Sequence, residues 1–349
     1  MKLTSIAEVA ALDFDTIIDV RSPSEFAEDH IPGAINLPVL DDEERARVGT
    51  IYKQVAPFDA RKIGAALVAQ NAAKHLQGPL ADKEGGWRPL VYCWRGGQRS
   101  GSFATILKQV GWRVELVEGG YKAFRSLVVE AGLAAMPCPV VVLDGNTGTA
   151  KTDILKAARA QGAQVIDLEG LANHRGSLFG AMEGGQSSQK DFESRLIMEI
   201  AALDPARPVL LEAESSKIGD LQLPAGIWAA IKDAPRLRVR APLSERAQYL
   251  ARAYADITAD ADRLLAVLDQ LRPFQPAERI AAWQAQATAG EYAALAGELM
   301  RDHYDPRYEK HRARHVERER VIEADSLAPE AIEGLAAQVV KEAQEMAER

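Results

Sequence analysis

The sequence has very few cysteines and no long apolar run. Only Cys93 and Cys138 occur in 349 residues, so disulfides cannot be the basis of the fold, and a reducing cytoplasm is the expected location. The longest apolar stretches, such as PVVVL, are far too short to cross a bilayer. The opening MKLTSIAEVAALDFD lacks the basic and apolar regions of a signal peptide. We therefore expect a cytoplasmic protein with free thiols and no membrane partner.

Repeats, low-complexity linkers and a strong excess of positive charge are also missing. The net charge of −8 argues against indiscriminate nucleic-acid binding, although a local basic face is compatible with it. Residues 301–320 mix arginine, acidic residues and histidine, which is typical of a solvated helical face with ion pairs. The alternative is an RNA-binding face on which Tyr304 and Tyr308 stack against bases.

The length and the pattern of apolar runs predict two α/β domains, residues 1–135 and 136–349, separated near MPCPV. In both halves, short apolar runs such as RPLVYC and PVVVLDG alternate with helical patterns, which predicts parallel sheets covered by helices. Beyond Ser244 the chain is alanine-rich and helical in period. We therefore expect the second domain to carry a helical C-terminal extension.

The stretch VYCWRGGQRSG, residues 91–101, places Cys93 at the end of a predicted buried strand. The glycine-rich turn and the following helix start can direct backbone N–H groups at an anion on the sulfur. Arg95 and Arg99 are expected to lower the thiol pKa and favour the thiolate. A cysteine phosphatase is a rival interpretation because the spacing is C-x5-R, but tyrosine precedes the cysteine and no acid for the leaving group is evident. Cys138, between two prolines, is interpreted as a small buried hydrophobe.

The first domain resembles a rhodanese. The stretch DVRSPSEFAEDHIPGAINLP is similar to the N-terminal signature of that family, and the Cys93 loop lies where the family has its active cysteine. The resemblance implies that Cys93, with Arg95 and Arg99, is catalytic. It further implies a persulfide or selenopersulfide on the sulfur, stabilised by the loop amides.

The stretch GNTGTAKT, residues 145–152, has the frame of a Walker A loop, with Ala150 where a glycine normally precedes the lysine. An apolar run precedes it and a helical pattern follows, as such a loop requires. The expected phosphate-binding residues are Gly145, Asn146, Thr147, Gly148, Thr149, Lys151 and Thr152. The Ala150 methyl group argues against efficient nucleotide hydrolysis. Glu212 or Glu214 could hold magnesium directly or through water, and a merely solvated carboxylate is the alternative.

Two further polar stretches, DLEGLANHRGSLFG and QSSQKDFESRL, follow the phosphate loop. Together with GNTGTAKT and EAESSKIG, in this order, they resemble the P-loop half of the bacterial tRNA 2-selenouridine synthases. Those proteins join a rhodanese domain to a P-loop domain, and the resemblance covers nearly the whole chain. Ala150, Ser187 and Ala213 depart from the family pattern.

The resemblance implies a two-step modification of the wobble 2-thiouridine of tRNA. Geranyl diphosphate first alkylates the sulfur at the P-loop, and selenium from selenophosphate, relayed by Cys93, then replaces the geranylated sulfur. It implies that His174, Arg175, Gln189 and Lys190 bind substrate, that no cofactor is tightly bound, and that a selenophosphate-producing enzyme is a partner. Two alternatives stay open: a sulfurtransferase with a regulatory P-loop domain, and a P-loop ATPase or RNA-binding switch whose rhodanese half is only an interaction module.

Overall fold

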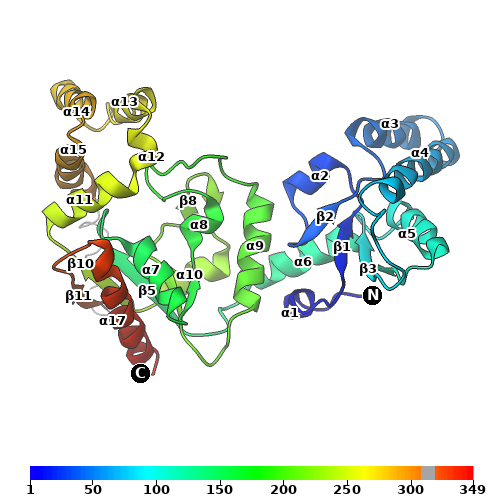
Figure 1. Cartoon of the computed structure of the whole chain (residues 1–349), viewed down its shortest axis with the longest axis horizontal. Helices are drawn as coiled ribbons and strands as arrows, with labels where there is room; N and C mark the ends of the chain where they lie inside the picture. Colours follow the sequence, from blue (N-terminus) through cyan, green and yellow to red (C-terminus); the bar gives the residue numbers. More distant parts are fainter. Residues whose placement is uncertain (308–318, 349) are drawn as a thin grey trace. The chain divides into compact units, whose positions relative to one another are not determined.

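The structure is a computed structural model that describes residues 1–307 and 319–348 and divides into two compact units (Figure 1). The first consists of Met1–Ala134 and Ser187–Ala202, and the second of Ala135–Gln186 and Leu203–Arg349. The break at Ala134 lies next to the expected one. The segment Ser187–Ala202, however, leaves the second half of the sequence and packs with the first unit. Two runs of chain therefore build each unit.

A four-stranded parallel sheet forms the centre of the first unit, in the order β2-β1-β3-β4. Its strands are β1 (Thr16–Asp19), β2 (Ala34–Asn36), β3 (Pro89–Tyr92) and β4 (Glu115–Leu116). Asp19 pairs with Tyr92 in the register, so β1 and β3 end side by side. The residues that follow these two strands therefore meet at one edge of the sheet, where parallel sheets place ligands.

Helices cover both faces of this sheet. They are α1 (Ile6–Ala10), α2 (Pro23–Glu28), α3 (Asp42–Gln54), α4 (Pro57–Gln77), α5 (Gln98–Val110), α6 (Gly120–Leu133) and α9 (Gln189–Ala201). The helices α3 and α4 form a hairpin, and α9 packs against α1 and α6. The core includes Ile18, Val91, Phe103 and Leu107, none of which is exposed to solvent.

The second unit is built on a five-stranded parallel sheet in the order β11-β10-β5-β7-β6. Its strands are β5 (Val140–Gly145), β6 (Gln164–Ile166), β7 (Val209–Glu212), β10 (Arg236–Arg240) and β11 (Glu319–Glu323), beside a small antiparallel hairpin of β8 (Lys217–Ile218) and β9 (Leu221–Gln222). All six residues of the central strand β5 are buried. Both sheets confirm the expected α/β class.

Strand β11 is an element that the helical pattern after Ser244 did not predict. It lies at the edge of the sheet and pairs with β10 alone. Ile322 is buried and its neighbours Val321 and Glu323 are exposed, as expected for alternating side chains on a strand. This alternation was not recognised in the sequence because the strand has only five residues, three of them charged.

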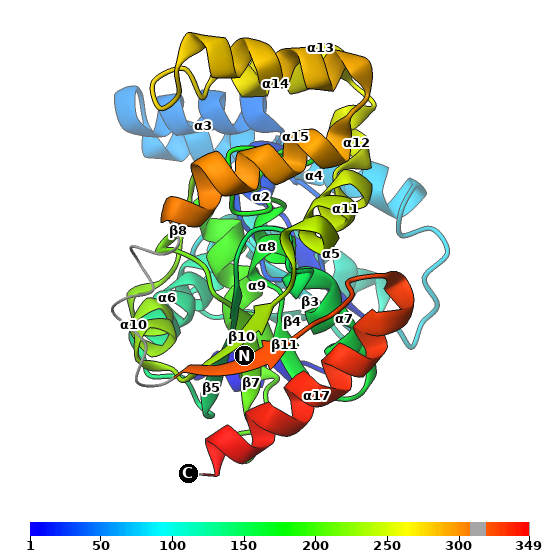
Figure 2. The same ribbon diagram turned by 90° about the vertical axis from the view of Figure 1, so that its left-hand side faces the viewer.

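Helices flank the second sheet and extend beyond it (Figure 2). They are α7 (Lys151–Ala160), α8 (Leu168–Ala172), α10 (Ala225–Asp233), α11 (Leu243–Ala253), α12 (Ala255–Thr258), α13 (Ala261–Asp269), α14 (Ala277–Ala289), α15 (Tyr292–Leu299), the π-helical turn η1 (Met300–Tyr304) and α17 (Pro329–Ala347). A separate apolar cluster around Trp283 joins α12 to α15, which confirms the helical extension. In the described part of the chain, every helix is too short or too polar to span a membrane.

Candidate functional sites

Cys93 follows β3 directly, and its sulfur accepts two hydrogen bonds. The backbone N–H of Gly97 lies 3.3 Å from Sγ, and the Ser100 hydroxyl lies 3.1 Å from it. Both donors come from the loop and the first turn of α5, which begins at Gln98. The cysteine is 3% exposed and Ser100 is fully buried. The strand-loop-helix unit thus directs its donors at one sulfur.

These donors favour the thiolate. Burial opposes ionisation of Cys93, but hydrogen bonds from the Ser100 hydroxyl and from the backbone amides of Ser100, Gly97 and Arg95 outweigh it and lower the pKa of the thiol. Guanidinium groups are not among these main causes, in contrast to the sequence-based expectation. Ser100 was not among the predicted site residues, although its position one turn into the helix makes its hydroxyl available to the loop.

Glycines allow the loop to pack this tightly. Gly96 and Gly120 have φ angles of 65° and 58°, in the left-handed region. A Cβ atom on Gly96 would lie 2.7 Å from the Val117 carbonyl oxygen, and one on Gly120 would lie 2.6 Å from the Gly96 nitrogen. Larger residues at either position would push the thiol loop away from the start of α6.

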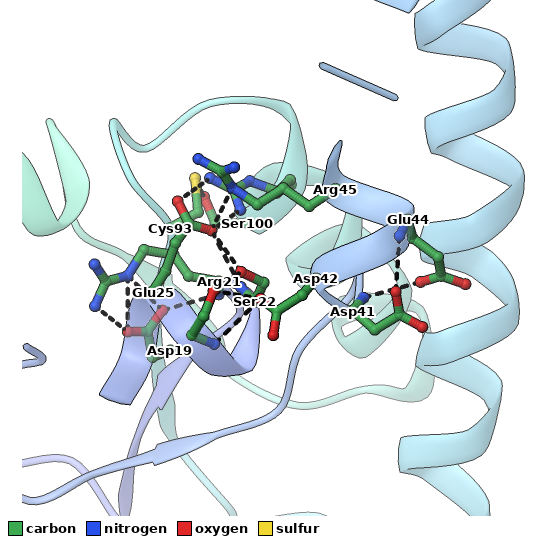
Figure 3. A network of polar contacts seen from close by, with 12 residues as sticks. Asp19, Arg21, Ser22, Glu25, Asp41, Asp42, Glu44, Arg45, Cys93 and Ser100 are labelled. Carbon is green, nitrogen blue, oxygen red and sulfur yellow. Dashed lines mark hydrogen bonds and ion pairs between the residues drawn. The ribbon is translucent and has the colours of Figure 1, made fainter. Parts of the chain in front are cut away.

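Arg99 is committed to a carboxylate rather than to the sulfur. Its Nη1 donates to Glu25 Oε2 at 2.7 Å, and Arg45 pairs with the same oxygen at 3.0 Å. Burial disfavours the Glu25 charge, but hydrogen bonding and attraction to Arg99 and Arg45 outweigh burial and lower its pKa. Figure 3 shows this cluster beside Cys93 and Ser100. Arg95 is exposed. The role predicted for both arginines therefore stays a prediction, and their effect on the thiol pKa is not supported.

A second ion pair, which is buried, lies at the end of β1. Arg21 and Asp19 are fully buried, and Arg21 Nη2 lies 2.6 Å from Asp19 Oδ2 (Figure 3). The same nitrogen donates to the Asp29 carbonyl at 2.5 Å, and the guanidinium lies 3.9 Å from the centre of the Tyr121 ring. A buried pair with all these partners holds the chain after β1 in one geometry.

Asp29 connects α9 to the first unit. Its Oδ2 accepts hydrogen bonds from Tyr121 at 2.7 Å and from Ser194 of α9 at 2.9 Å. Burial raises the pKa of the Asp29 carboxyl, and the two hydroxyls and Arg125 oppose that rise. Arg125 also contacts Glu193. These polar contacts explain why α9 belongs to the first unit although its sequence lies far from it.

The phosphate loop joins the central strand β5 to α7 in the second unit. The cavity above it holds about 290 Å³ and is lined by Thr147, Gly148, Thr149, Ala150, Lys151 and Thr152, with Lys156, Glu169, Arg175 and Glu214 among its other walls. Gly145 and Asn146, also predicted to bind phosphate, lie before these residues and outside that lining. Lys151 Nζ donates to the Gly145 carbonyl at 3.0 Å, so the lysine folds back over the loop.

A brace from α11 holds the phosphate loop from behind. Arg246 is 5% exposed, and its Nε donates to the Thr147 carbonyl at 2.9 Å. Its two terminal nitrogens donate to both oxygens of Asp305, which also accepts from Asn146. The sequence did not predict this contact. Arg246 and Asp305 lie 99 and 158 positions after Thr147, in a region whose residue pattern indicated helices but no role at the phosphate loop.

Ala150 has a left-handed backbone conformation, which explains why glycine is usual at this position of a Walker A loop. Its φ is 58° and ψ is 26°, the left-handed region, and its side chain is 2% exposed. A non-glycine residue pays about 1 kcal/mol or more for this geometry. The departure at Ala150 is therefore accommodated by backbone strain, and the loop keeps its shape.

The two carboxylates predicted to hold magnesium lie in different environments. Glu212 is fully buried and accepts from the Leu168 N–H at 2.9 Å, and it does not line the phosphate cavity. Burial and nearby acidic groups raise the pKa of Glu212 well above its ordinary range. Because its carboxylate lies outside the phosphate cavity, Glu212 does not fit a direct ligand of a cation bound there.

Glu214 does line the phosphate cavity, together with Glu169. Burial and the charge of Glu169 raise the pKa of Glu214 to about 8, against the opposing effect of Lys151. Thr152 Oγ1 donates to Glu169 Oε2 at 3.0 Å. Within the described ranges 1–307 and 319–348 no group of three or more acidic, histidine or cysteine side chains is arranged to hold a metal ion.

An apolar cavity of about 70 Å³ adjoins the phosphate cavity within the second unit. Most of its walls come from the helical extension and include Leu264, Tyr292, Leu295, Ala296 and Leu299, while Phe179 lines it from the segment after α8. Four residues line both cavities: Thr147, Ser177, Leu250 and Tyr254. The phosphate loop thus lines a polar cavity that shares part of its wall with a small apolar one.

The four predicted substrate-binding residues divide between the units. Arg175 lines the phosphate cavity, where it pairs with Asp256 at 3.0 Å and lies 4.7 Å from the centre of the Tyr254 ring. His174 Nδ1 accepts from the Gly176 N–H, and burial lowers the pKa of its imidazole.

Gln189 and Lys190 belong to α9. Lys190 pairs with Glu28 at 2.6 Å and Gln189 donates to Glu193 at 2.8 Å, so both residues make contacts inside the first unit. Substrate binding by any of the four stays a prediction.

The charged segment 301–320 falls largely outside the described residues, since 308–318, including Tyr308, are not described. Tyr304 lines the apolar cavity.

Comparison with known proteins agrees with this division. Residues 5–127 match the rhodanese-like domain, and residues 138–275 match the tRNA 2-selenouridine synthase AAA domain. The tRNA 2-selenouridine synthase of Alcanivorax borkumensis is 35% identical over 323 residues, covering 84% of this chain and 88% of that protein. The chain belongs to the tRNA 2-selenouridine synthase family.

Other members of this family of tRNA-modifying enzymes show similar agreement. The Chromohalobacter salexigens protein of the same name is 38% identical over 258 residues (73% of this chain, 70% of that protein), and the one from Pseudomonas syringae is 32% identical over 338 residues (86% and 90%). Among solved structures, the N-terminal domain of a putative ATP/GTP binding protein from Clostridium difficile 630 is 38% identical, covers 36% of this chain and 98% of that chain, and has a TM-score of 0.32.

Proposed function

We propose that this family member synthesises 2-selenouridine at the wobble 2-thiouridine of tRNA in the cytoplasm. Geranyl diphosphate alkylates the sulfur at the phosphate cavity, and Cys93 relays selenium that replaces the geranylated sulfur. Names and lengths of the relatives support the overall reaction. The observation that carries the assignment of the alkyl donor is that the polar and the apolar cavity lie side by side and share four lining residues.

A ligand with an anionic head and a short apolar tail fits these cavities. Backbone amides at the start of α7 and Lys151 favour a diphosphate. An apolar tail that extends past Thr147 and Leu250 would lie in the apolar cavity, whose walls are mainly leucine, tyrosine and alanine side chains. Those walls offer few partners for the polar base and ribose of a nucleotide, whose burial without hydrogen bonds is costly. The small volume of the apolar cavity argues against a long prenyl chain.

In the first step, the thiocarbonyl sulfur of 2-thiouridine attacks C1 of geranyl diphosphate. A sulfur–carbon bond forms, the carbon–oxygen bond breaks, and its electron pair leaves with the diphosphate, while the N3 proton of the base is lost to solvent. Lys151 and the loop amides stabilise the charge that develops on the leaving oxygens. Protonated Glu214 removes one negative charge from the same wall and so lowers the repulsion that the diphosphate meets.

In the second step, the Cys93 thiolate takes selenium from selenophosphate. The sulfur–selenium bond forms as the selenium–phosphorus bond breaks, and the electron pair of that bond leaves on phosphorus, which departs as phosphite. The terminal selenium then attacks C2 of the alkylated nucleoside and expels geranyl thiol. One low-molecular-weight thiol attacks the Cys93 sulfur and releases the selenouridine, which leaves Cys93 in a mixed disulfide, and a second thiol frees the Cys93 thiolate as the two thiols become a disulfide. The hydrogen bonds from Gly97 and Ser100 stabilise the sulfur anion that begins and ends this cycle. The enzyme that makes selenophosphate is the expected donor partner.

Nucleoside mass spectrometry tests the division of labour. Thiolated tRNA is incubated with geranyl diphosphate and selenophosphate and either wild-type protein, Cys93→Ser, Cys138→Ser or Lys151→Ala. Cys93→Ser should accumulate geranylated nucleoside without selenouridine, Lys151→Ala should lose geranylation, and Cys138→Ser should behave as wild type. Selenouridine formed by Cys93→Ser at the wild-type rate would refute the relay, and geranylation by Lys151→Ala at the wild-type rate would refute the role of the phosphate loop.

Filling the apolar cavity tests the alkyl site. Ala296→Leu adds bulk to its wall, and Ala281→Leu makes the same change on the exposed face of α14. Calorimetry should show weaker binding of geranyl diphosphate to Ala296→Leu with binding of inorganic pyrophosphate unchanged. Equal affinities of both variants for geranyl diphosphate would show that the tail lies elsewhere.

A further inference from the structure

The α3–α4 hairpin of the first unit has a surface that the packing of the domain does not require. Helix α3 has 13 residues and none of them is buried. It packs on α4, whose buried residues lie toward the sheet. A helix without a buried face contributes little to a core, so the identity of its side chains calls for another explanation.

Large apolar side chains lie exposed at the tip of this hairpin. Tyr52 is 57% exposed, Val55 73% and Phe58 65%. Burying aromatic rings is favourable, so two rings in solvent at one tip mark a surface for a partner. Flat rings that stand in solvent are also the feature on which unpaired nucleobases stack, whatever their sequence.

The tip is basic in an acidic protein. Residues 45–65 contain Arg45, Arg47, Lys53, Arg61 and Lys62 against Asp59 alone, whereas the whole chain carries −8. Arg47, Lys53 and Arg61 are exposed. Positive charge interleaved with aromatic rings is complementary to a single-stranded phosphate backbone with splayed bases. The positive local charge favours a polyanion as the partner of this surface.

A cavity of about 300 Å³ lies between this tip and the helix that follows the thiol loop. Tyr52 and Arg61 line it from the hairpin, and Gln98, Arg99 and Ser102 line it from α5. Its remaining walls are apolar and include Leu40, Val48 and Val68. A pocket with apolar walls and a few polar groups at its rim suits a flat heteroaromatic ring.

We propose that the α3–α4 tip binds unpaired nucleotides of the RNA substrate. Bases stack on Tyr52 and Phe58, Arg47, Lys53 and Arg61 contact phosphates, and the cavity beside Arg99 receives a base turned out of the loop. The identity of the RNA as a tRNA anticodon loop rests on the proposed function. The binding surface itself rests on the exposed rings, the local charge and the cavity.

Fluorescence anisotropy with a labelled anticodon stem–loop RNA tests the proposal. Full-length protein is used without geranyl diphosphate or selenophosphate, so no chemistry occurs. Tyr52→Ala and Phe58→Ala should each weaken stem–loop binding about tenfold, and binding of a fully paired RNA duplex should change much less. Lys53→Gln should reduce the slope of log K against log salt by about one. Leu133→Ala, which removes a residue that is 67% exposed on α6 of the same unit, is the matched control.

The outcomes separate this surface from the chemistry. Wild-type affinity of both aromatic variants for the stem–loop would overturn the proposal, and so would equal losses toward stem–loop and duplex. A change in self-association by sedimentation, with RNA binding intact, would assign the tip to a second copy and also overturn it. If the binding results hold while no selenouridine forms in the complete reaction, the proposed function alone fails.

Discussion

Removing the Ser100 hydroxyl is expected to make Cys93 a poorer nucleophile. Ser100 donates to the sulfur at 3.1 Å from a fully buried position, so water cannot replace the hydrogen bond without rearrangement. The Ser100 hydroxyl is the first of the groups that lower the thiol pKa against the effect of burial. Ser100→Ala should therefore raise that pKa.

The size of the effect follows from the charge on the acceptor. A hydrogen bond to an ionised group contributes about 1.5 kcal/mol or more, and about 1.4 kcal/mol corresponds to tenfold in an equilibrium constant. The Gly97 N–H remains in place at 3.3 Å and keeps part of the stabilisation. We expect about tenfold less thiolate in Ser100→Ala at any pH below the thiol pKa.

The assay is the pH dependence of iodoacetamide alkylation, with the modified cysteine identified by peptide mass spectrometry. Cys138 serves as an internal reference because burial and the charge of Asp204 raise its pKa, so it should react slowly. Ser102→Ala, on the same helix and away from the sulfur, is the matched control and should react like wild type. Arg99→Gln should change the rate less than Ser100→Ala, since Glu25 holds its guanidinium.

Two results would refute this reasoning. An unchanged alkylation profile in Ser100→Ala would mean that the hydroxyl does not stabilise the thiolate. A larger effect of Arg99→Gln than of Ser100→Ala would restore the guanidinium group as the main cause.

Three further changes test other parts of the structure. Ser194→Ala should lower the free energy of unfolding by about 1–3 kcal/mol in urea titrations, because buried Asp29 loses a donor, whereas exposed Ser126→Ala should change it by less than about 0.5 kcal/mol. In the folded protein the pKa of Glu214 is about 8, above its ordinary 4.5, so between these pH values the folded protein holds a proton that the unfolded protein has released, and the free energy of unfolding falls as the pH rises. Glu214→Gln should flatten this decline, and an identical decline in the variant would contradict the assignment. In thermal unfolding, Ala150→Gly should change the free energy of unfolding by less than about 1 kcal/mol, because relief of backbone strain offsets the loss of a buried methyl group, whereas Ala150→Val should lower it by more than about 2 kcal/mol. Unchanged stability of the valine variant would show that residue 150 is not in the left-handed conformation.

The sequence alone was sufficient to predict the features that neighbouring residues along the chain determine. Alternating apolar runs identified the strands before Cys93 and Gly145, and the turns after them identified the thiol loop and the phosphate loop. Such predictions succeed because a buried parallel strand followed by a glycine-rich turn is encoded within about a dozen neighbouring residues. The helical extension followed from its period for the same reason.

Tertiary structure decided which side chains meet. The sequence pointed to arginines as the groups that activate Cys93, but folding turned Arg99 toward Glu25 and brought Ser100 to the sulfur. It buried Glu212 at the end of β7 and left Glu214, two residues beyond the strand, in the cavity. It also placed α9 on the first unit through Asp29, a contact across 165 positions. These outcomes depend on packing and burial between distant segments, which no local pattern of residues records.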